Sequence, residues 1–182
     1  AAGATTLPKA IDIAVADFLR AGITCIEYKD GRRVNIADYA EMALRTAATR
    51  AKLQGDAALR AQLGVDTVLV SAYGQCSETC LPWQGRVYID DVFGTFSGDR
   101  SGDRGHSVNG HWYPLLSVAV RHGLFHPNCR HTLSTWYEGV STMPKPLDAA
   151  IVRRNAKLEQ QQRALERKLR QAKRLEAGCT DP

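Results

Sequence analysis

The chain has 182 residues, of which 44% are hydrophobic and 24% charged, with 15 Gly and 7 Pro. This composition is typical of a globular domain and excludes wholesale disorder, collagen and low-complexity fibre. No run of about 18 apolar residues occurs, so the sequence predicts no membrane span. The net charge of +5 is uneven, because residues 1–149 are balanced while residues 150–177 carry nine basic and three acidic residues. The start AAGATT, without Met, suggests a fragment or a processed product.

The first third of the chain predicts a helix, a hairpin and a long helical segment. Apolar residues recur at helical spacing between Pro8 and Gly22. The β-prone runs 25–28 and 33–36 flank an Asp-Gly pair, which is a strong hairpin signal. Segment 37–63 is rich in Ala, Leu, Arg and Gln and predicts one long helix, or two helices that break at Gly55. Asn35 or Asp38 would cap its start.

The middle of the chain predicts short strands around a loop and a short helix. Runs 67–70, 86–89 and 133–137 are the expected strands, and 115–122 is the expected helix. Two successive Ser-Gly-Asp-Arg sequences lie in loop 93–110, which we expect to be a mobile surface insertion. The predicted fold class is therefore α+β, a small and mainly antiparallel sheet flanked by helices, with a long basic C-terminal helix.

The last segment predicts a helix over about 148–177, after a linker that contains Pro144 and Pro146. We therefore expect two units, an α+β domain over residues 1–143 and a linker with a basic helix over 144–182. Apolar residues repeat every seven positions along this helix, at Ile151, Leu158, Leu165 and Ala172. So narrow a stripe indicates a helix that docks on a partner by one edge.

The basic residues of this helix predict a surface for nucleic acid or an acidic partner, although a solvated face is the commoner explanation of such a pattern. They are Arg153, Arg154, Lys157, Arg163, Arg167, Lys168, Arg170, Lys173 and Arg174.

The cysteines and two histidines suggest a metal site. The odd count of five cysteines and the lack of a secretion signal argue against a disulfide framework. Zinc prefers four thiolate or imidazole ligands, and two close groups on separate loops would supply them. The expected set is Cys76, Cys80 and Cys129 with either His126 or His131. The alternative is that these are small buried thiols beside a hydrogen-bonded histidine.

A catalytic interpretation uses some of the same residues. Imidazoles and guanidinium groups can form an acid–base and phosphate-clamping set of the kind found in metal-independent ribonucleases. Nucleophilic catalysis through the Cys129 thiol is a second version. The residues of the first version are His126 and His131 with Arg130, Arg45 and Tyr73.

Four stretches of the sequence carry a resemblance to a known family. They are YKDGRRVNIADYAEMALRTAATRA (28–51), PWQGRVY (82–88), LFHPNCRHTLSTWYEG (124–139) and LEQQQRALERKLRQAKRLEAG (158–178). Together they resemble the phage minor capsid protein 2 family, relatives of the Mu F-type head morphogenesis proteins. In similar proteins a Cys or His pair precedes the tryptophan-glycine turn, where this chain has Cys76 and Cys80. Members are usually longer, so the resemblance implies a C-terminal portion.

The resemblance implies a non-enzymatic virion protein of the phage head, made in few copies and assembled in the bacterial host cytoplasm. Its expected partners are portal or capsid proteins and also DNA, during head assembly or DNA packaging, and its expected cofactor is structural zinc. The alternative is a nuclease or toxin-like effector domain that uses His126, Arg130 and His131. A third hypothesis is an interaction module that docks a partner helix on the Ile151, Leu158 and Leu165 edge.

Overall fold

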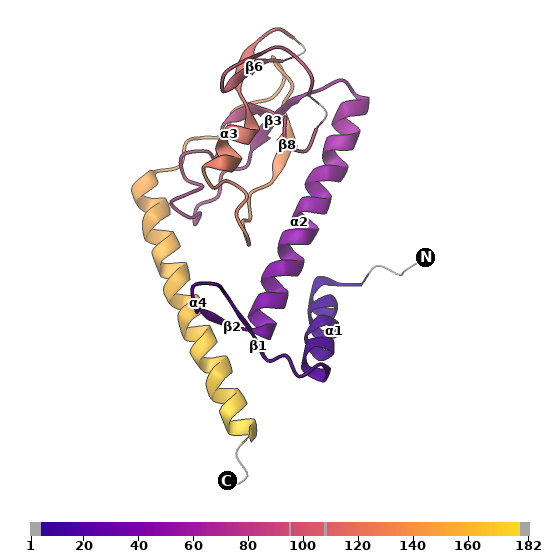
Figure 1. Ribbon diagram of the computed structural model, residues 1–182. Helices are drawn as coiled ribbons and strands as arrows, with labels where there is room; N and C mark the ends of the chain where they lie inside the picture. The colour runs from indigo at the N-terminus through magenta and orange to yellow at the C-terminus, as the bar shows by residue number, and fades with distance from the viewer. Residues whose placement is uncertain (1–4, 95, 108, 179–182) are drawn as a thin grey trace.

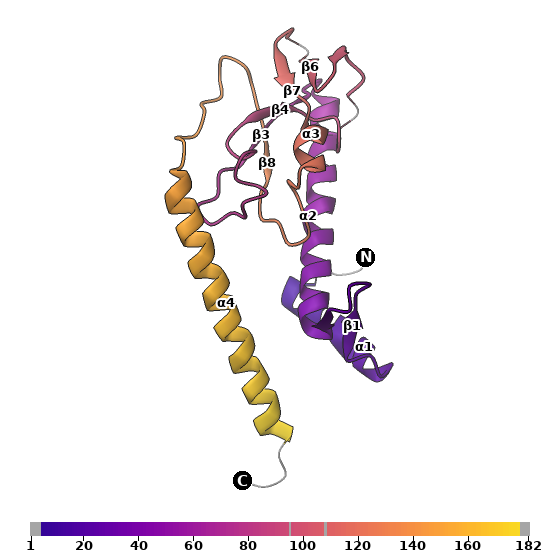
Figure 2. The ribbon, with the colours of Figure 1, turned by 60° about the vertical axis from the view of Figure 1, so that its left-hand side comes forward.

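The computed structural model describes residues 5–94, 96–107 and 109–178. The two three-stranded sheets and the short helix form a body at one end, from which two long helices extend (Figures 1 and 2). Helix α2 (Ile36–Gln62) connects this body to α1 (Leu7–Arg20) and a small hairpin at the other end. Helix α4 (Ala149–Gly178) leaves the body and runs toward the same far end. The predicted α+β class is confirmed.

The N-terminal elements follow their local sequence signals. The side chain of Thr6 accepts a hydrogen bond from the Lys9 backbone N–H and caps α1, whose first turn contains proline. Strands β1 (Cys25–Glu27) and β2 (Arg33–Asn35) pair antiparallel, as the Asp-Gly turn predicts. Gly31 adopts φ +80° in that turn, a conformation in which glycine has no Cβ penalty.

Helix α2 is continuous, which confirms the expectation of one long helix over the alternative of a break at Gly55. Its cap is Asn35, whose Oδ1 accepts from the Ala37 backbone N–H at 3.0 Å. The neighbours of Gly55 explain the continuity, because Leu53 and Ala57 are both buried on the face that packs against the body. Their burial offsets the roughly 1 kcal/mol that an internal glycine costs a helix.

The central sheet has three short strands in the order β4–β3–β8, all antiparallel. They are β3 (Thr67–Val70), β4 (Val87–Ile89) and β8 (Leu133–Thr135). β8 is therefore two residues shorter than the sequence predicted. The sheet lies in the core, with Val68, Val70, Tyr88 and Ile89 almost fully buried. Helix α3 (Leu116–Arg121) adds Leu116 and Ala119 to the same core.

The Ser-Gly-Asp-Arg segment lies at the surface, as predicted, but it contains a short hairpin that the sequence did not predict. Strands β5 (Arg100–Ser101), β6 (Arg104–His106) and β7 (Trp112–Pro114) make a second antiparallel sheet. The Asp103 carbonyl accepts from the Leu115 backbone N–H at 2.8 Å, and its carboxylate binds Arg121 at 3.0 Å. These tertiary contacts tie the hairpin to α3, which a local pattern does not reveal.

Helix α4 packs on the body by a narrow edge at Val152, whereas the predicted stripe of Ile151, Leu158 and Leu165 is exposed. Asp148 Oδ1 accepts from the backbone N–H groups of Ala150 and Ile151 and caps its start. Among the described residues of α4 only Val152 is buried. In the part of the chain that the structure describes, no helix is both long and apolar enough to cross a membrane.

Candidate metal centre

The predicted metal ligands surround one cavity of about 200 Å³ beside the central sheet. Its walls come from the loop after β3, the turn before β8 and one edge of α4. Cys80 and Cys129, 49 positions apart in the chain, meet here because β3 and β8 are adjacent strands. The sequence-predicted ligands that line the cavity are Cys76, Cys80, Cys129, His126 and His131.

Three of these five residues form a compact buried cluster. The ligand atoms of Cys80, Cys129 and His131 all lie within 4.8 Å of one another. The two sulfurs are 3.8 Å apart, and Cys129 Sγ is 3.2 Å from His131 Nδ1. Cys76 and His126 line the same cavity but lie outside this cluster.

The backbone of the His-Pro-Asn-Cys turn presents the Cys129 thiol to the cavity. Asn128 adopts φ +65°, a left-handed conformation that asparagine tolerates better than most residues. The Cys129 backbone N–H donates to the His126 carbonyl at 2.9 Å and closes the turn. The Asn128 backbone N–H donates to Thr46 Oγ1 at 3.0 Å, which anchors the turn to α2.

Gln84 fixes the orientation of the His131 ring. Its Oε1 already accepts from the Tyr73 backbone N–H at 2.7 Å and lies 3.1 Å from His131 Nε2. An oxygen can only accept, so Nε2 carries the proton and the Nδ1 lone pair faces the sulfurs. This is the arrangement of a metal-ligating histidine, whose second nitrogen donates to an oxygen. The motif search missed Gln84, although it lies in the PWQGRVY stretch.

Electrostatics favour one thiolate in the cluster. The hydrogen bond from Cys129 lowers the pKa of Cys80, and the same bond raises the pKa of Cys129. Burial raises the pKa of Cys76 to about 11, with a further contribution from the nearby Cys80 charge. A hydrogen bond with Cys80 raises the pKa of His126. Cys80 is therefore the thiol that these contacts favour as a thiolate, and a bound cation would stabilise it.

The spacing of the cluster fits a tetrahedral zinc ion. Two thiolates at about 2.3 Å from a tetrahedral zinc lie about 3.8 Å apart, which is the separation of the Cys80 and Cys129 sulfurs. His131 supplies a third ligand atom. Both Cys76 and His126 line the cavity, so the fourth ligand is open between them. His126 Nε2 also lies 3.0 Å from Ser77 Oγ.

The residues of the catalytic interpretation are only partly assembled. Arg130 lies at the cavity rim, 3.0 Å from the Tyr73 hydroxyl and 3.3 Å from Glu159. Arg45 does not line this cavity and instead pairs with Glu41 at 2.7 Å. Both nitrogens of His131 are engaged, and its side chain is almost fully buried.

The remaining two cysteines lie elsewhere. Cys25 belongs to β1, where the Arg33 guanidinium lies 3.1 Å from its sulfur. Cys179 lies outside the described residues.

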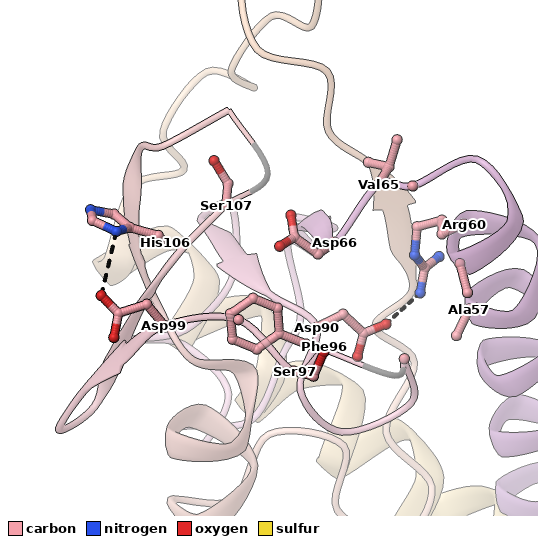
Figure 3. A pocket seen from close by; sticks show the side chains of 14 residues that line it. Ala57, Arg60, Val65, Asp66, Asp90, Phe96, Ser97, Asp99, His106 and Ser107 are labelled. Carbon is pink, nitrogen blue, oxygen red and sulfur yellow. Dashed lines mark hydrogen bonds and ion pairs between the residues drawn. The ribbon is translucent and has the colours of Figure 1, made fainter.

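A second buried polar pair lies at the opposite end of the central sheet (Figure 3). Arg60 at the end of α2 binds the Asp90 carboxylate at 2.6 Å, and both side chains are nearly inaccessible. Asp90 also accepts from the Phe93 backbone N–H at 2.9 Å. The pair borders a cavity of about 340 Å³, and His106 and Asp99 lie together on the other side of it, 3.8 Å apart. Sequence reasoning missed this pair, because its members are 30 residues apart and carry no motif.

The basic residues predicted to bind nucleic acid all lie on α4, which the sheet body covers little. Arg153 pairs with Glu78 at 2.9 Å, Arg163 with Glu159, and Arg170 with Asp38 at 3.5 Å.

Comparison with protein families supplies the identity that the geometry leaves open. The family model for phage minor capsid protein 2 matches residues 1–181. Searches of curated proteins and of solved structures gave no significant match. The resemblance seen in four separate stretches therefore extends over nearly the whole chain. The protein belongs to the phage minor capsid protein 2 family, a family of virion proteins.

Proposed function

We propose that this protein is a non-enzymatic component of the phage head, assembled in the host cytoplasm, that attaches to portal or capsid proteins through α4. In the same proposal, the basic residues of α4 contact packaged DNA. Membership of the minor capsid family supports the structural role.

The observation that carries the proposal is the exposure of α4. This helix has 30 residues and is therefore about 45 Å long. Leu158, Leu165 and Leu169 are each more than half exposed. A line of large apolar side chains on one face of a helix is typical of a protein interaction surface.

The charge of α4 supports the DNA contact. Nine basic side chains against three acidic ones give the helix a strong positive field. Each lysine or arginine that contacts a phosphate releases a counterion, which makes binding insensitive to sequence and steeply dependent on salt.

A structural zinc ion is part of the proposal. It would be held by Cys80, Cys129 and His131, with Cys76 or His126 as the fourth ligand. A closed, buried site of thiolate and imidazole is typical of structural zinc, which contributes to folding. Such a site would cross-link the loop after β3 to the turn before β8.

The nuclease alternative has weaker support in the geometry. General acid–base catalysis needs a ring nitrogen within reach of substrate, and both nitrogens of His131 already have partners. Incubation of the protein with RNA and DNA, with and without chelator, tests the alternative. Cleavage that His131→Ala abolishes would support the nuclease and contradict the structural role.

Substitutions on α4 test the attachment. Leu158→Ser with Leu165→Ser removes apolar area from the exposed stripe, whereas Gln161→Ser changes a polar, exposed position of the same helix. We expect phage heads purified from host cells to contain the Gln161→Ser protein at the wild-type amount and the leucine variant at a much lower amount. Equal incorporation of both variants would contradict attachment through this stripe.

A further inference from the structure

An arginine-lined cleft of about 620 Å³ lies between α4 and the N-terminal part of the molecule. One wall is α4, and the other comes from β2, the first half of α2 and the turn before β8. Seven arginines and three carboxylates line it among the described residues. The arginines on the wall opposite α4 include Arg33, Arg45 and Arg130.

The face of α4 that contacts the body also lines the cleft farther along the helix. Val152, Ala156, Glu159 and Arg163 follow each other at intervals of three or four residues, which places them on one face of a helix. Val152 is buried in the core. Ala156, Glu159 and Arg163 line the cavity that holds the cysteine cluster. The same face then presents arginines beyond the body, at Arg163, Arg167, Arg170 and Arg174.

The exposed leucines lie on the opposite side of the same helix. At 100° per residue, Leu158 and Leu165 are about 140–160° around the axis from Arg163. Helix α4 therefore has two separate faces. The apolar face is turned away from the cleft, while the arginine face lines it.

The carboxylates of the cleft do not balance its arginines. Glu41 pairs with Arg45, and Asp38 with Arg170. Glu159, just outside the lining, pairs with both Arg130 and Arg163. Seven guanidinium groups against these four carboxylates leave an excess of about three positive charges, because arginine stays protonated at neutral pH. Arg45 Nε is shielded from solvent and has no hydrogen-bond partner among the described residues. A ligand with several negative charges would offset this excess.

The chemistry of the lining favours phosphate groups over bases. Guanidinium groups bind phosphate oxygens through two parallel hydrogen bonds. No aromatic side chain is among the described residues that line the cleft, whereas proteins that bind single strands stack bases on aromatic rings. The ligand that fits is a backbone whose bases are already stacked and paired.

We propose that this arginine cleft, and not the outer surface of α4, binds the phosphate backbone of double-stranded DNA. The inference rests on the DNA contact in the proposed function and assigns it to one side of α4. From Arg163 to Arg174 the helix rises about 16 Å. One DNA strand advances 3.4 Å per nucleotide, so this face spans about five phosphates.

Two matched triple variants of the full chain test the assignment. Arg167→Gln, Arg170→Gln and Arg174→Gln remove three charges from the cleft face. Arg154→Gln, Lys157→Gln and Lys173→Gln remove three charges from other faces of α4, and all six positions are exposed. The probes are two 30-base-pair DNA duplexes of unrelated sequence. Binding to each is measured by fluorescence anisotropy at several salt concentrations.

We expect the cleft variant to weaken Kd about tenfold or more at about 100 mM salt, and to lower the salt slope by about three. The other variant should lower the slope by less than one. Arg45→Gln, on the opposite wall, should weaken duplex binding although it leaves the charge of α4 unchanged.

Other outcomes separate the two proposals. If both triple variants weaken duplex binding equally, the assignment of DNA binding to the cleft is wrong, but the proposed DNA contact of α4 stands. If neither triple variant changes duplex binding, both the cleft assignment and the DNA contact of α4 are wrong. A preference of about tenfold for single-stranded over duplex DNA, or full competition by millimolar inorganic phosphate, also overturns the assignment to a duplex backbone.

Discussion

The central sheet buries polar groups at both of its ends, and the two ends differ in how their charges are balanced. At the end where β3 begins, the Arg60 cation meets the Asp90 anion at 2.6 Å. At the end where β8 begins, two thiols and an imidazole share protons around Cys80 and Cys129. The first cluster pairs its own charges, whereas the proposed zinc ion would balance the charge of the second.

The difference shows why a sheet of such short strands can be stable. Strands of three or four residues provide little pairing, so the segments that leave the sheet must be held by other contacts. An ion pair does this with the side chains of the protein alone. A metal site does it only when the metal is bound, which makes the folding free energy depend on metal concentration.

Breaking the ion pair is the largest expected effect. Arg60→Ala leaves the Asp90 carboxylate buried without its cation, and we expect a loss of about 3–5 kcal/mol in the free energy of unfolding. Urea denaturation measures the loss. Arg121→Ala, which breaks the exposed pair with Asp103, is the control and should change stability by less than about 0.5 kcal/mol. Similar values for both variants would show that burial does not distinguish the pairs.

Removing a metal ligand sharpens the contrast between the two ends. With free zinc at about 100 times its Kd, binding stabilises the native state by about 2.7 kcal/mol. Cys129→Ser should abolish this zinc-dependent stabilisation, while Cys25→Ser on β1 should retain it. Thermal unfolding with and without zinc measures the difference. Elemental analysis that finds zinc well below one per wild-type chain would rule out the structural site.

Tyr88 should make the free energy of unfolding depend on pH in the alkaline range. Its hydroxyl donates to the Trp83 carbonyl at 2.9 Å, and burial raises its pKa to about 12. A raised pKa stabilises the protein fully below the unfolded value of about 10, and this stability is lost as pH rises through about 12. Tyr88→Phe should cost about 0.5–1.5 kcal/mol at neutral pH.

The same variant should flatten the decline in stability between about pH 10 and 12. Denaturation at a series of pH values tests this. A decline as steep as that of the wild type would show that another group is responsible.

The smallest expected effect is on the exposed face of α4, which contrasts with both ends of the sheet. Leu165 is 66% exposed, so Leu165→Ser should change the free energy of unfolding by less than about 0.5 kcal/mol. Val152→Ala on the buried edge of the same helix removes two methyl-sized groups and should cost about 0.8 kcal/mol for each. A large loss from Leu165→Ser would mean that the leucine stripe packs within the chain.

Local signals in the sequence were sufficient for most helices and strands. The Asp-Gly turn predicted the β1–β2 hairpin, and Asn35 was one of two caps expected for α2. Tertiary packing decided what local preference left open or did not reveal. Gly55 did not break α2, because Leu53 and Ala57 bury beside it. The segment around Gly102 forms a hairpin whose Asp103 carbonyl accepts from the Leu115 backbone N–H, a contact between residues that are not neighbours in sequence.

For the candidate site, the sequence predicted which residue types matter and the fold determined which of them meet. The Cys and His pattern identified five residues that are among those lining the cavity. Of these five, only three form the compact cluster. Gln84, which orients His131, has no spacing signal because it lies 47 residues away along the chain.

The sequence by itself determined the family, the periodicity of α4 and the concentration of positive charge in its last segment, since these are properties of residue order. Only the tertiary structure decided that Arg60 meets Asp90, that Cys80 meets Cys129, and that the arginines of α4 face a cleft while its leucines face outward. The physical reason is that such contacts join residues that are distant in sequence, and they form only where strand order and helix docking bring those residues together.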